Sequence, residues 1–238
     1  MTDSTETSLP ADNRLLAALP VEEYIGLFPK LEKFVLNYEE NIYRKNEEIR
    51  YVYFPNSGII SLLTAVEDNL TLEVGLIGKE GIVGLALFLG VKISNISAIV
   101  QGNGSAMRMT AEDFLVECKN GGALPRILQR FTHSRLTQVS QAAACYRFHP
   151  IEARLARWLL MTADRMEAAE FQITQEFLSN MLGVRREAVN KSAVALQQQQ
   201  LISYSRGHIL IINRKGLEKA TCLCYDIIKN EETSFPAK

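Results

Sequence analysis

The sequence has few cysteines, no long apolar segment and no pattern typical of a signal peptide, and each absence narrows the expected class of protein. Four cysteines in 238 residues are too few and too scattered for a disulfide framework. The longest nearly apolar run, 81–91, is much shorter than the ~20 residues that a membrane-spanning helix needs. Residues 1–12 are rich in Thr, Ser, Asp and Glu and lack a basic start before an apolar run, so they predict a disordered tail. We therefore expect a cytoplasmic protein without a membrane segment.

Motifs of catalysis are also missing. The chain has no phosphate-cradling Gly-x-x-x-x-Gly-Lys run, no Gly-x-Ser-x-Gly elbow and no His-Glu-x-x-His pair. Its three histidines, His133, His149 and His208, are expected on a helix, in a hinge and in a hairpin, where they would not converge. We predict no catalytic residue and no cofactor, because none of these motifs is present and the three histidines would not converge.

The cysteines give little indication of a metal. They are Cys118, Cys145, Cys222 and Cys224. Only Cys222 and Cys224 are close in sequence, on what is expected to be a C-terminal helix. A Cys-x-Cys pair without further Cys or His nearby is weak support for metal binding and leaves a structural or redox role open. We predict no metal site.

Residues 174–212 have the layout of a winged helix-turn-helix. The Thr174 hydroxyl can cap a first helix, and Gly183 supplies the sharp turn after it. The apolar side chains at helical spacing on this first helix are Leu178, Met181 and Leu182. Residues 184–198 predict a second helix, which contains no Gly or Pro. The stripe that can pack this helix against the first consists of Val189, Ala193 and Leu196.

Another face of the second helix carries side chains of the kinds that read base edges in the major groove. They are Arg186, Glu187, Asn190 and Lys191. Arg forks onto guanine, Asn binds adenine, Glu accepts from cytosine amino groups, and Lys reaches guanine or phosphate. Because these residues gather at the N-terminal end of the helix, where a helix usually enters the groove, we predict that they read bases.

The segment after Leu201-Ile202 predicts two short strands around a hairpin turn at Arg206-Gly207-His208, which would lie along the phosphate backbone as a wing. The side chains predicted to contact the backbone are Thr174, Arg185, Arg206 and His208. Between residues 172 and 219, seven basic residues stand against three acidic ones, although the whole chain has a net charge of −1. Two packed helices and a hairpin also occur in proteins that never bind DNA, so the spacing alone leaves that alternative open.

These residues carry a resemblance to a known family. The segment resembles the C-terminal domain of the Crp/Fnr superfamily of bacterial transcription regulators, whose recognition helix begins with an Arg-Glu pair and has a basic residue four positions beyond the Glu. Here those positions are Arg186, Glu187 and Lys191. The small N-cap residue that the family often has is replaced by Arg185. The resemblance implies an α+β fold with an N-terminal antiparallel β-roll of the cyclic-nucleotide-binding type, a long dimerisation helix and a C-terminal winged helix-turn-helix.

The N-terminal part has the pattern that such a roll requires. Asn13 can cap a short helix over residues 14–19, and residues 21–27 predict a second. Short β-rich runs follow at 51–54, 59–63, 70–77, 96–100 and 105–109. The segments with turn chemistry between them are 55–58, 67–69, 78–81 and 101–104. We therefore assign the roll to residues 13–123.

Residues 124–148 predict the dimerisation helix and hinge. The side chains expected at the dimer interface are Leu124, Leu128, Phe131, Arg135, Gln138, Ala142 and Cys145. A two-fold axis along this helix would place two recognition helices on successive major grooves. The pattern alone also fits a core helix within one subunit. After the hinge at 149–152, residues 151–166 predict an amphipathic helix that opens the DNA-binding domain, 149–238.

The sequence departs from its relatives at the effector pocket. In members that bind cyclic nucleotides, a Gly-Glu pair holds the ribose, and an Arg-Ser or Arg-Thr followed by Ala binds the cyclic phosphate. The corresponding residues here are Gly84-Leu85 and Ile96-Ser97-Ala98, while Ser140 takes the base-contacting position on the long helix. The pocket is then expected to bind another small molecule or to be vestigial. The cysteines near the N-terminus that hold iron–sulfur clusters in some members are lacking as well.

Together these features predict a homodimeric regulator that binds a pseudo-palindromic operator in double-stranded DNA. RNA polymerase is a further possible partner, and the signal is unidentified. The alternative is a protein-interaction or small-molecule-binding module without specific DNA binding. Such a module would lack the affinity for DNA, falling steeply with salt concentration, that a DNA-binding regulator shows.

Overall fold

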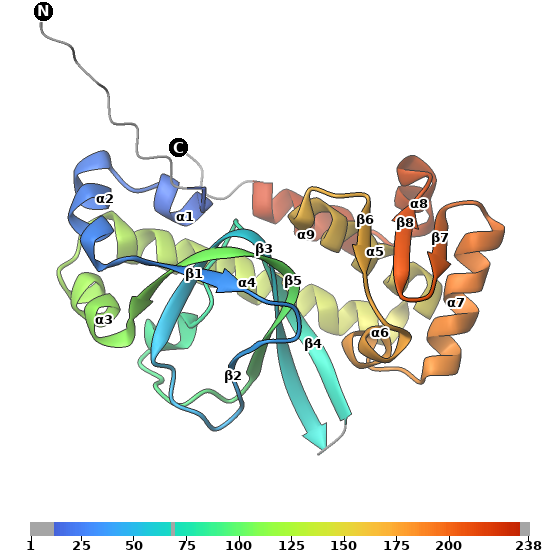
Figure 1. Ribbon diagram of the computed structural model, residues 1–238, viewed down its shortest axis with the longest axis horizontal. Coiled ribbons are helices and arrows are strands. Elements are labelled where there is room, and N and C mark those ends of the chain that lie inside the picture. Colours follow the sequence, from blue (N-terminus) through green and yellow to red (C-terminus); the bar gives the residue numbers. More distant parts are fainter. Residues whose placement is uncertain (1–11, 68–69, 234–238) are drawn as a thin grey trace, which may run out of the picture.

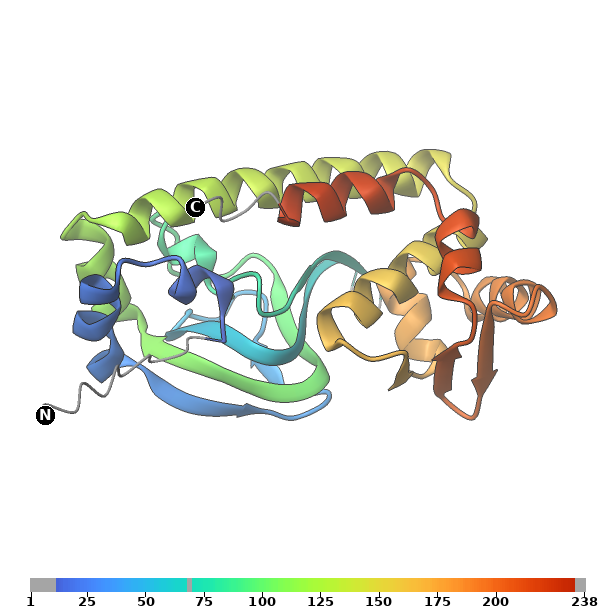
Figure 2. The same ribbon diagram turned by 90° about the horizontal axis from the view of Figure 1, so that it is seen from above.

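The computed structural model describes residues 12–67 and 70–233 (Figure 1). Most of the tail predicted at 1–12 and of the turn predicted at 67–69 lies outside these residues. No helix of the described residues is both long and apolar enough to cross a bilayer. Seen from above, the β-roll and the C-terminal domain lie side by side, and one long helix spans both (Figure 2).

The chain opens with helices α1 (Arg14–Ala17) and α2 (Val21–Leu27), followed by a 3-10 turn, η1 (Phe28–Lys30). Asn13 caps α1 as predicted, because its Oδ1 accepts from the amides of Leu15 and Leu16 at 3.0 and 3.3 Å. Its buried Nδ2 also donates to the carbonyls of Pro55 and Gly81, both at 2.9 Å. One side chain thus starts the helix and joins it to the roll.

The roll is an antiparallel five-stranded sheet. Its strands are β1 (Glu32–Leu36), β2 (Asn41–Tyr43), β3 (Tyr51–Glu67), β4 (Leu70–Ile77) and β5 (Ser97–Thr110), with a 3-10 turn η2 (Leu85–Leu87) before β5. The strand order is β1-β5-β3-β4, and β2 also pairs with β5. The strands enclose an apolar core that includes Phe54, Ile60, Val100 and Met109.

Two of the predicted turns are wrong, because β3 and β5 each run through them. The segments 55–58 and 101–104 face each other in this sheet, where the register of β3 and β5 shifts at successive positions. Gly58 has a φ of +79°, and an added Cβ would lie 2.6 Å from the Gly102 carbonyl oxygen. These bulges bend two long strands instead of ending four short ones. The short strands β1 and β2 were not predicted, because most of their side chains are exposed or only partly buried.

Two helices follow the roll. Helix α3 (Ala111–Lys119) is capped by Thr110, whose hydroxyl accepts from the Asp113 amide at 3.1 Å. Helix α4 (Ala123–Phe148) has 26 residues and packs along the roll and beside the C-terminal helix. It confirms the predicted long helix, whereas α3 was not predicted.

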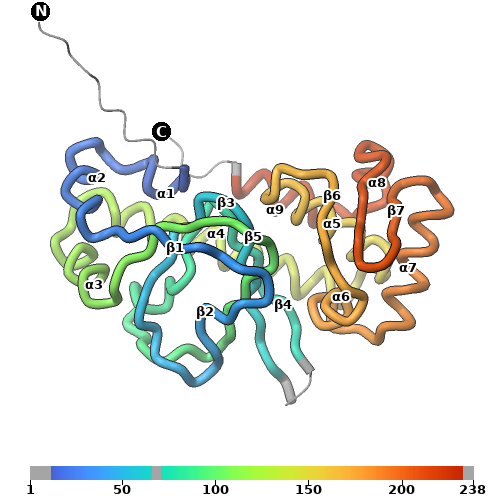
Figure 3. The backbone as a smooth tube through the Cα atoms, in the orientation of Figure 1, coloured from blue at the N-terminus to red at the C-terminus, as the bar shows by residue number. Residues whose placement is uncertain are grey.

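The C-terminal domain begins with α5 (Ile151–Met166), whose bounds are those predicted, with Pro150 as N-cap. The later elements are β6 (Glu170–Gln172), α6 (Gln175–Leu182), α7 (Arg186–Gln198), β7 (Ile202–Ser205), β8 (His208–Ile211), α8 (Arg214–Ala220) and α9 (Cys224–Thr233). The three strands form a sheet in the order β6-β8-β7. The tube in Figure 3 shows how the chain returns after the wing through α8 and α9, and α9 packs against α4.

The core of this domain contains residues of the roll. Ile59 and Leu76, from β3 and β4, belong to the same buried cluster as Trp158 of α5 and Leu182 of α6. Polar contacts cross the same boundary, since Gln101 Nε2 donates to Thr162 Oγ1 at 3.1 Å. The roll and the C-terminal domain therefore share one continuous apolar contact.

Candidate nucleic-acid interface and effector region

The helix-turn-helix is formed by α6 and α7. Thr174 caps α6 as predicted, with its hydroxyl accepting from the Phe177 amide at 3.1 Å. Gly183 ends the helix in the left-handed region, at a φ of +62°, where a side chain would be strained. Helix α7 starts at Arg186, two residues later than predicted, because the Val184 amide still bonds back to the Ser179 carbonyl at 3.0 Å.

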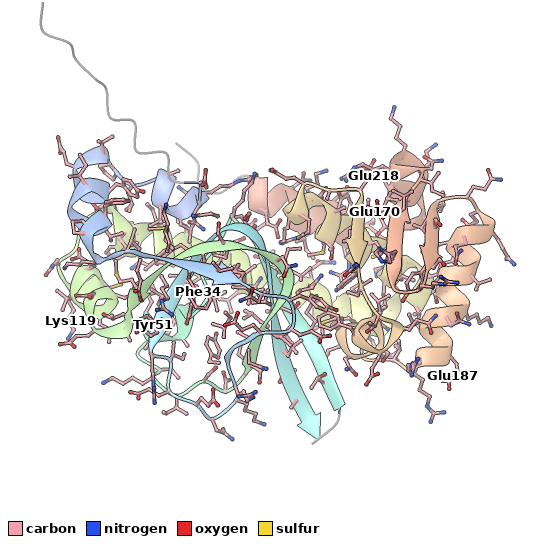
Figure 4. All side chains as sticks on the ribbon, in the orientation of Figure 1. Phe34, Tyr51, Lys119, Glu170, Glu187 and Glu218 are labelled. Atoms are coloured by element: carbon pink, nitrogen blue, oxygen red, sulfur yellow. The ribbon has the colours of Figure 1, made fainter. Side chains whose placement is uncertain are left out.

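Helix α7 turns one face to the core and the other to solvent. The predicted stripe of Val189, Ala193 and Leu196 is buried. The four residues predicted to read bases are all exposed, namely Arg186, Glu187, Asn190 and Lys191. In Figure 4, Glu187 lies at one end of α7, on the outer edge of the molecule. The structure thus brings the four side chains together on an accessible surface.

One residue of this surface was not predicted. Gln175, the first residue of α6, donates from Nε2 to Asn190 Oδ1 at 3.1 Å. This bond orients the Asn190 amide and places a second amide beside it. Its only sequence signal is a polar side chain directly after the Thr174 cap, which is too common to single out.

The wing is a two-residue hairpin. Ser205 pairs with His208, and the two residues between them, Arg206 and Gly207, have φ values of +50° and +80°. Positive φ at both central residues is the type I′ geometry, whose twist matches that of the strands. Arg206 and His208 are both exposed, as is Arg185 at the start of α7. His208 starts β8 and does not belong to the turn, which makes the turn one residue shorter than predicted.

Some of the basic residues near the wing are paired within the chain. Arg214 donates to Asp164 at 2.5 Å and to Glu218 at 3.1 Å, so it anchors α8 to α5. His208 Nδ1 lies 4.0 Å from a Glu170 carboxylate oxygen, and its Nε2 lies 3.2 Å from Gln172 Nε2. Arg185, Arg186, Lys191 and the wing tip therefore keep charges that can face a phosphate, as do the exposed Lys215 and Lys219 of α8.

The residues predicted at the dimer interface lie on the inner side of α4. Leu124, Leu128, Phe131, Gln138, Ala142 and Cys145 are buried within the single chain. The ring of Phe131 would lie 2.6 Å from a Cβ added at Gly81 of the roll, and the guanidinium of Arg135 packs against Gly75. The structure thus corrects the choice of residues, since these seven side chains pack inside one subunit.

The opposite side of α4 is exposed. The exposed positions that recur there at spacings of three and four are Arg126, Gln129, His133, Leu136, Ser140, Ala143 and Arg147. Leu136 is 63% exposed and the neighbouring Val139 is 42% exposed. We call these seven residues the outer stripe. In Figure 2, α4 forms one long edge of the molecule, and none of the described elements lies outside it.

The residues predicted to form the effector pocket do not line a common cavity. Leu85 packs against the roll core, Ser97 Oγ accepts from the Lys45 amide at 3.0 Å, and Ser140 belongs to the outer stripe. Gly84 has a φ of +96° beside Val52, so its backbone conformation favours glycine. Ala98 is buried in the sheet, and Ile96 precedes β5.

The space between the roll and α4 is filled by charged side chains. A cavity of only about 10 Å³ remains there, lined by residues that include Glu80, Phe131, Arg135 and Glu232. Arg165 of α5 donates to Glu80 at 2.8 Å and also pairs with Glu232 of α9. Such a space holds at most about one water molecule. A larger hollow of about 470 Å³ lies elsewhere on the roll, lined by residues that include Tyr43, Arg50 and Tyr51.

A buried carboxylate lies between the roll and α5. Glu73 of β4 has its two oxygens 2.9 Å from Ser61 Oγ and 3.1 Å from Trp158 Nε1. Burial raises the pKa of Glu73 to about 7, against the opposing effects of the Ser61 hydroxyl and the Arg157 charge. The Tyr146 hydroxyl donates to the backbone carbonyl of the same residue at 2.7 Å. Glu73 thus connects the roll with the end of α4 and with α5.

Cys145, His149, Cys222 and Cys224 form a cluster near the hinge. Their sulfur and ring-nitrogen atoms all lie within 4.8 Å of one another. The sequence suggested only Cys222 and Cys224, because the other two residues are more than 70 positions away along the chain. A signal for Cys145 and His149 was present in their i, i+4 spacing at the end of a predicted helix.

Comparison with known families and structures agrees with this architecture. The family described as the Crp-like helix-turn-helix domain matches residues 153–220. A search of curated proteins finds no match to the chain.

Among solved structures, a regulator from Eubacterium rectale assigned to the Crp/Fnr family has a TM-score of 0.71 at 17% identity, covering 89% of this chain and 99% of its own. FixK2 from Bradyrhizobium japonicum has a TM-score of 0.68 at 17% identity, covering 81% and 98%. The c-di-GMP-responsive regulator CLP from Xanthomonas campestris has a TM-score of 0.66 at 16% identity, covering 81% and 99%. These likenesses confirm the predicted β-roll, long helix and winged helix.

Proposed function

We propose that this chain, which has a Crp-like helix-turn-helix domain and the fold of the Crp/Fnr regulators, is a transcription regulator that binds double-stranded DNA. The observation that carries the proposal is the exposed face of α7, where Arg186, Glu187, Asn190 and Lys191 lie together on a helix whose opposite face is buried. Such a regulator acts in the cytoplasm and is not an enzyme.

Each part of the surface has its own role in this proposal. Arg186 and Asn190 read guanine and adenine, while Glu187 and Lys191 contribute further contacts to base edges. Arg185, Arg206 and His208 contact phosphates on either side of the groove, and the exposed Thr174 and the partly buried Gln175 contact the DNA backbone at the start of α6. In this proposal the chain consists of a roll at 13–123, a dimerisation helix and hinge at 124–148, and a DNA-binding domain at 149–238.

The regulator acts as a homodimer joined through the outer stripe of α4. The spacings of three and four are those of a two-helix seam, and Ser140 and Ala143 are small enough for a close approach of two backbones. An isologous seam relates the two recognition helices by a two-fold axis, so the operator is pseudo-palindromic. As a transcription regulator bound to its operator, the dimer also contacts RNA polymerase.

The signal is not a cyclic nucleotide in this proposal. The space between the roll and α4 is occupied by Arg135, Arg165, Glu80 and Glu232, and the remaining cavity of about 10 Å³ is far too small for a nucleotide. The predicted pocket is then vestigial or serves another small molecule, for which the hollow of about 470 Å³ on the roll offers room. Among residues 12–67 and 70–233, no contact favours the alternative that the chain is a protein-interaction module.

The test is a selection of bound duplexes from a random DNA pool, followed by binding measurements by fluorescence anisotropy. The selected duplexes should share two half-sites related by a dyad, and affinity for them should fall steeply with salt. Arg186→Ala should weaken binding by about 1–3 kcal/mol and relax base choice at one position in each half-site. Arg44→Ala, at an exposed arginine of the roll, is the matched control and should bind like the parent.

Two results would contradict the proposal in different ways. If Arg186→Ala weakens all sequences equally, Arg186 contacts phosphate and the assignment of base readout is wrong. If the parent enriches no sequence and shows no salt-dependent affinity, the chain is an interaction module.

A further inference from the structure

The cluster of Cys145, His149, Cys222 and Cys224 joins three parts of the chain. Cys145 lies in the last turn of α4, and His149 is the residue that ends this helix, its amide bonding to the Cys145 carbonyl at 3.1 Å. Cys222 lies in the connection between α8 and α9, and Cys224 is the first residue of α9. The four side chains meet where the long helix turns into the DNA-binding domain.

The distances in the cluster agree with those around one tetrahedral metal ion. Cys145 Sγ lies 3.5 Å from Cys222 Sγ, and Cys224 Sγ lies 3.5 Å from His149 Nδ1. Tetrahedral zinc, with Zn–S bonds of about 2.3 Å and Zn–N bonds of about 2.0 Å, requires sulfur–sulfur separations of about 3.8 Å and sulfur–nitrogen separations of about 3.5 Å. Small side-chain rotations therefore suffice to complete the site.

The surroundings suit a site with a negative charge. Arg154 and Arg157 of α5 are buried, each has an Nε without a hydrogen-bond partner, and neither forms a salt bridge to any residue the structure describes. Electrostatic interactions link Arg154 with Cys145 and Cys222, and Arg157 with Cys145. A divalent ion with three thiolates and one neutral imidazole carries a net charge of −1. Such a centre would add a negative charge beside Arg154, which also donates to the Leu182 carbonyl and stacks on Tyr146, and beside Arg157, whose charge also acts on Glu73.

A side chain outside the cluster also contacts one of the four proposed ligands. Gln141 of α4 donates from Nε2 to Cys224 Sγ at 3.1 Å, which orients the sulfur toward the other ligands. Cys145 and Cys224 are buried, whereas Cys222 and His149 are partly exposed. A metal ion can therefore approach from the side of Cys222 and His149.

We propose that Cys145, His149, Cys222 and Cys224 bind one Zn²⁺ ion in a Cys₃His site. The ion ties the start of α9 to the end of α4, so it restrains the hinge between α4 and α5 at residues 149–150. An iron–sulfur cluster fits less well, because its cysteines bind different iron atoms and must stand farther apart than a single ion requires. A disulfide between Cys145 and Cys222 would leave Cys224 and His149 without a role.

The test uses the full chain, reduced and freed of metal with a chelator, and titrated with Co²⁺ without oxygen. One Co²⁺ per chain should bind and give the intense sulfur-to-cobalt charge-transfer absorption and strong visible bands of a tetrahedral thiolate site. Zn²⁺ should abolish these bands by displacing Co²⁺. Competition with a chromogenic chelator then gives the Zn²⁺ affinity.

The variants are Cys145→Ser, Cys222→Ser, Cys224→Ser and His149→Gln, and Cys118→Ser is the matched control because Cys118 packs against the roll core, outside the cluster. Each cysteine variant should lose about one third of the charge-transfer intensity. Each ligand variant should weaken Zn²⁺ binding by more than the about 10- to 100-fold that loss of an outer-shell partner costs. Cys118→Ser should behave like the parent, and circular dichroism verifies that every variant is folded.

The proposal is overturned if the reduced parent gives the weak spectrum of octahedral Co²⁺, or if Cys118→Ser loses as much affinity as the ligand variants. It is also overturned if the reduced parent binds no metal and Cys145 and Cys222 form a disulfide in air. The Co²⁺ spectrum of the parent chain tests the proposed site even if a variant fails to fold. None of these measurements uses DNA, so their failure would leave the proposed function untouched.

Discussion

Glu73→Gln should change how stability depends on pH. The carboxyl group is buried between the roll and α5, and desolvation raises its pKa from 4.5 to about 7. The folded chain therefore keeps the Glu73 proton up to about pH 7, while the unfolded chain loses it near pH 4.5. Folding takes up a proton between these values, so the Glu73 contribution to stability is present at low pH and is lost as pH rises from about 4.5 to 7.

The size of this effect follows from the shift. A change of one pKa unit corresponds to about 1.4 kcal/mol, so the Glu73 contribution falls by about 3 kcal/mol across this window. Glutamine does not titrate, and its amide can still bond to Ser61 and Trp158. The free energy of unfolding of Glu73→Gln minus that of the parent should then increase by about 3 kcal/mol between pH 4.5 and 8.

The assay is urea unfolding at a series of pH values, followed by tryptophan fluorescence of Trp158. Taking the difference between variant and parent cancels the titration of the other carboxylates. Glu48→Gln, at an exposed glutamate of the roll, is the control and should give a nearly flat difference. A difference that falls with pH for Glu73→Gln would refute the reasoning, because it would mean that Ser61, Trp158 and Arg157 outweigh desolvation.

Three further predictions concern the dimer, the effector and the turn between α6 and α7. Leu136→Glu places a charge in the outer stripe and should weaken the dimer in sedimentation experiments while circular dichroism stays unchanged, whereas Phe131→Glu should unfold the chain. If the Leu136→Glu dimer is as stable as that of the parent, the dimer interface lies elsewhere. Calorimetric titration with cyclic AMP and cyclic GMP should give no binding heat, and a low-micromolar dissociation constant would show an intact pocket. Gly183→Ala should cost about 1–2 kcal/mol in urea unfolding, because its φ is +62° and Leu72 lies 2.7 Å from the added Cβ; an unchanged midpoint would mean that the turn relaxes.

Local patterns in the sequence predicted the elements whose structure depends on neighbouring residues. The bounds of α5 and the caps Asn13 and Thr174 follow from short-range hydrogen bonding and helical spacing, and all three are confirmed. The face of α4 was harder to assign. An apolar stripe has the same spacing whether it packs on the subunit's own roll or on a partner, so the spacing alone does not indicate that Phe131 is buried within its own subunit.

Long-range features were not available from the sequence. Cys145 and Cys222 meet only because α9 packs back against α4, and no local pattern indicates that contact. The bends of β3 and β5 arise where glycine backbones of two strands approach each other, and glycine-containing segments of this kind predict turns when only the sequence is considered. The exposed residues of α7 could be predicted because their spacing on one helix determines which face they share.

The apolar contact through Ile59 and Leu76 has a consequence for the resting position of the recognition helix. Moving α7 relative to the roll would withdraw these two side chains from the C-terminal core, so the free energy of their burial contributes to the difference between the docked and undocked arrangements. One buried methylene contributes about 0.8 kcal/mol, which changes the ratio of the two populations about fourfold. Single apolar substitutions, distant from both DNA and any ligand, would thus set the threshold at which a regulator of this shape responds.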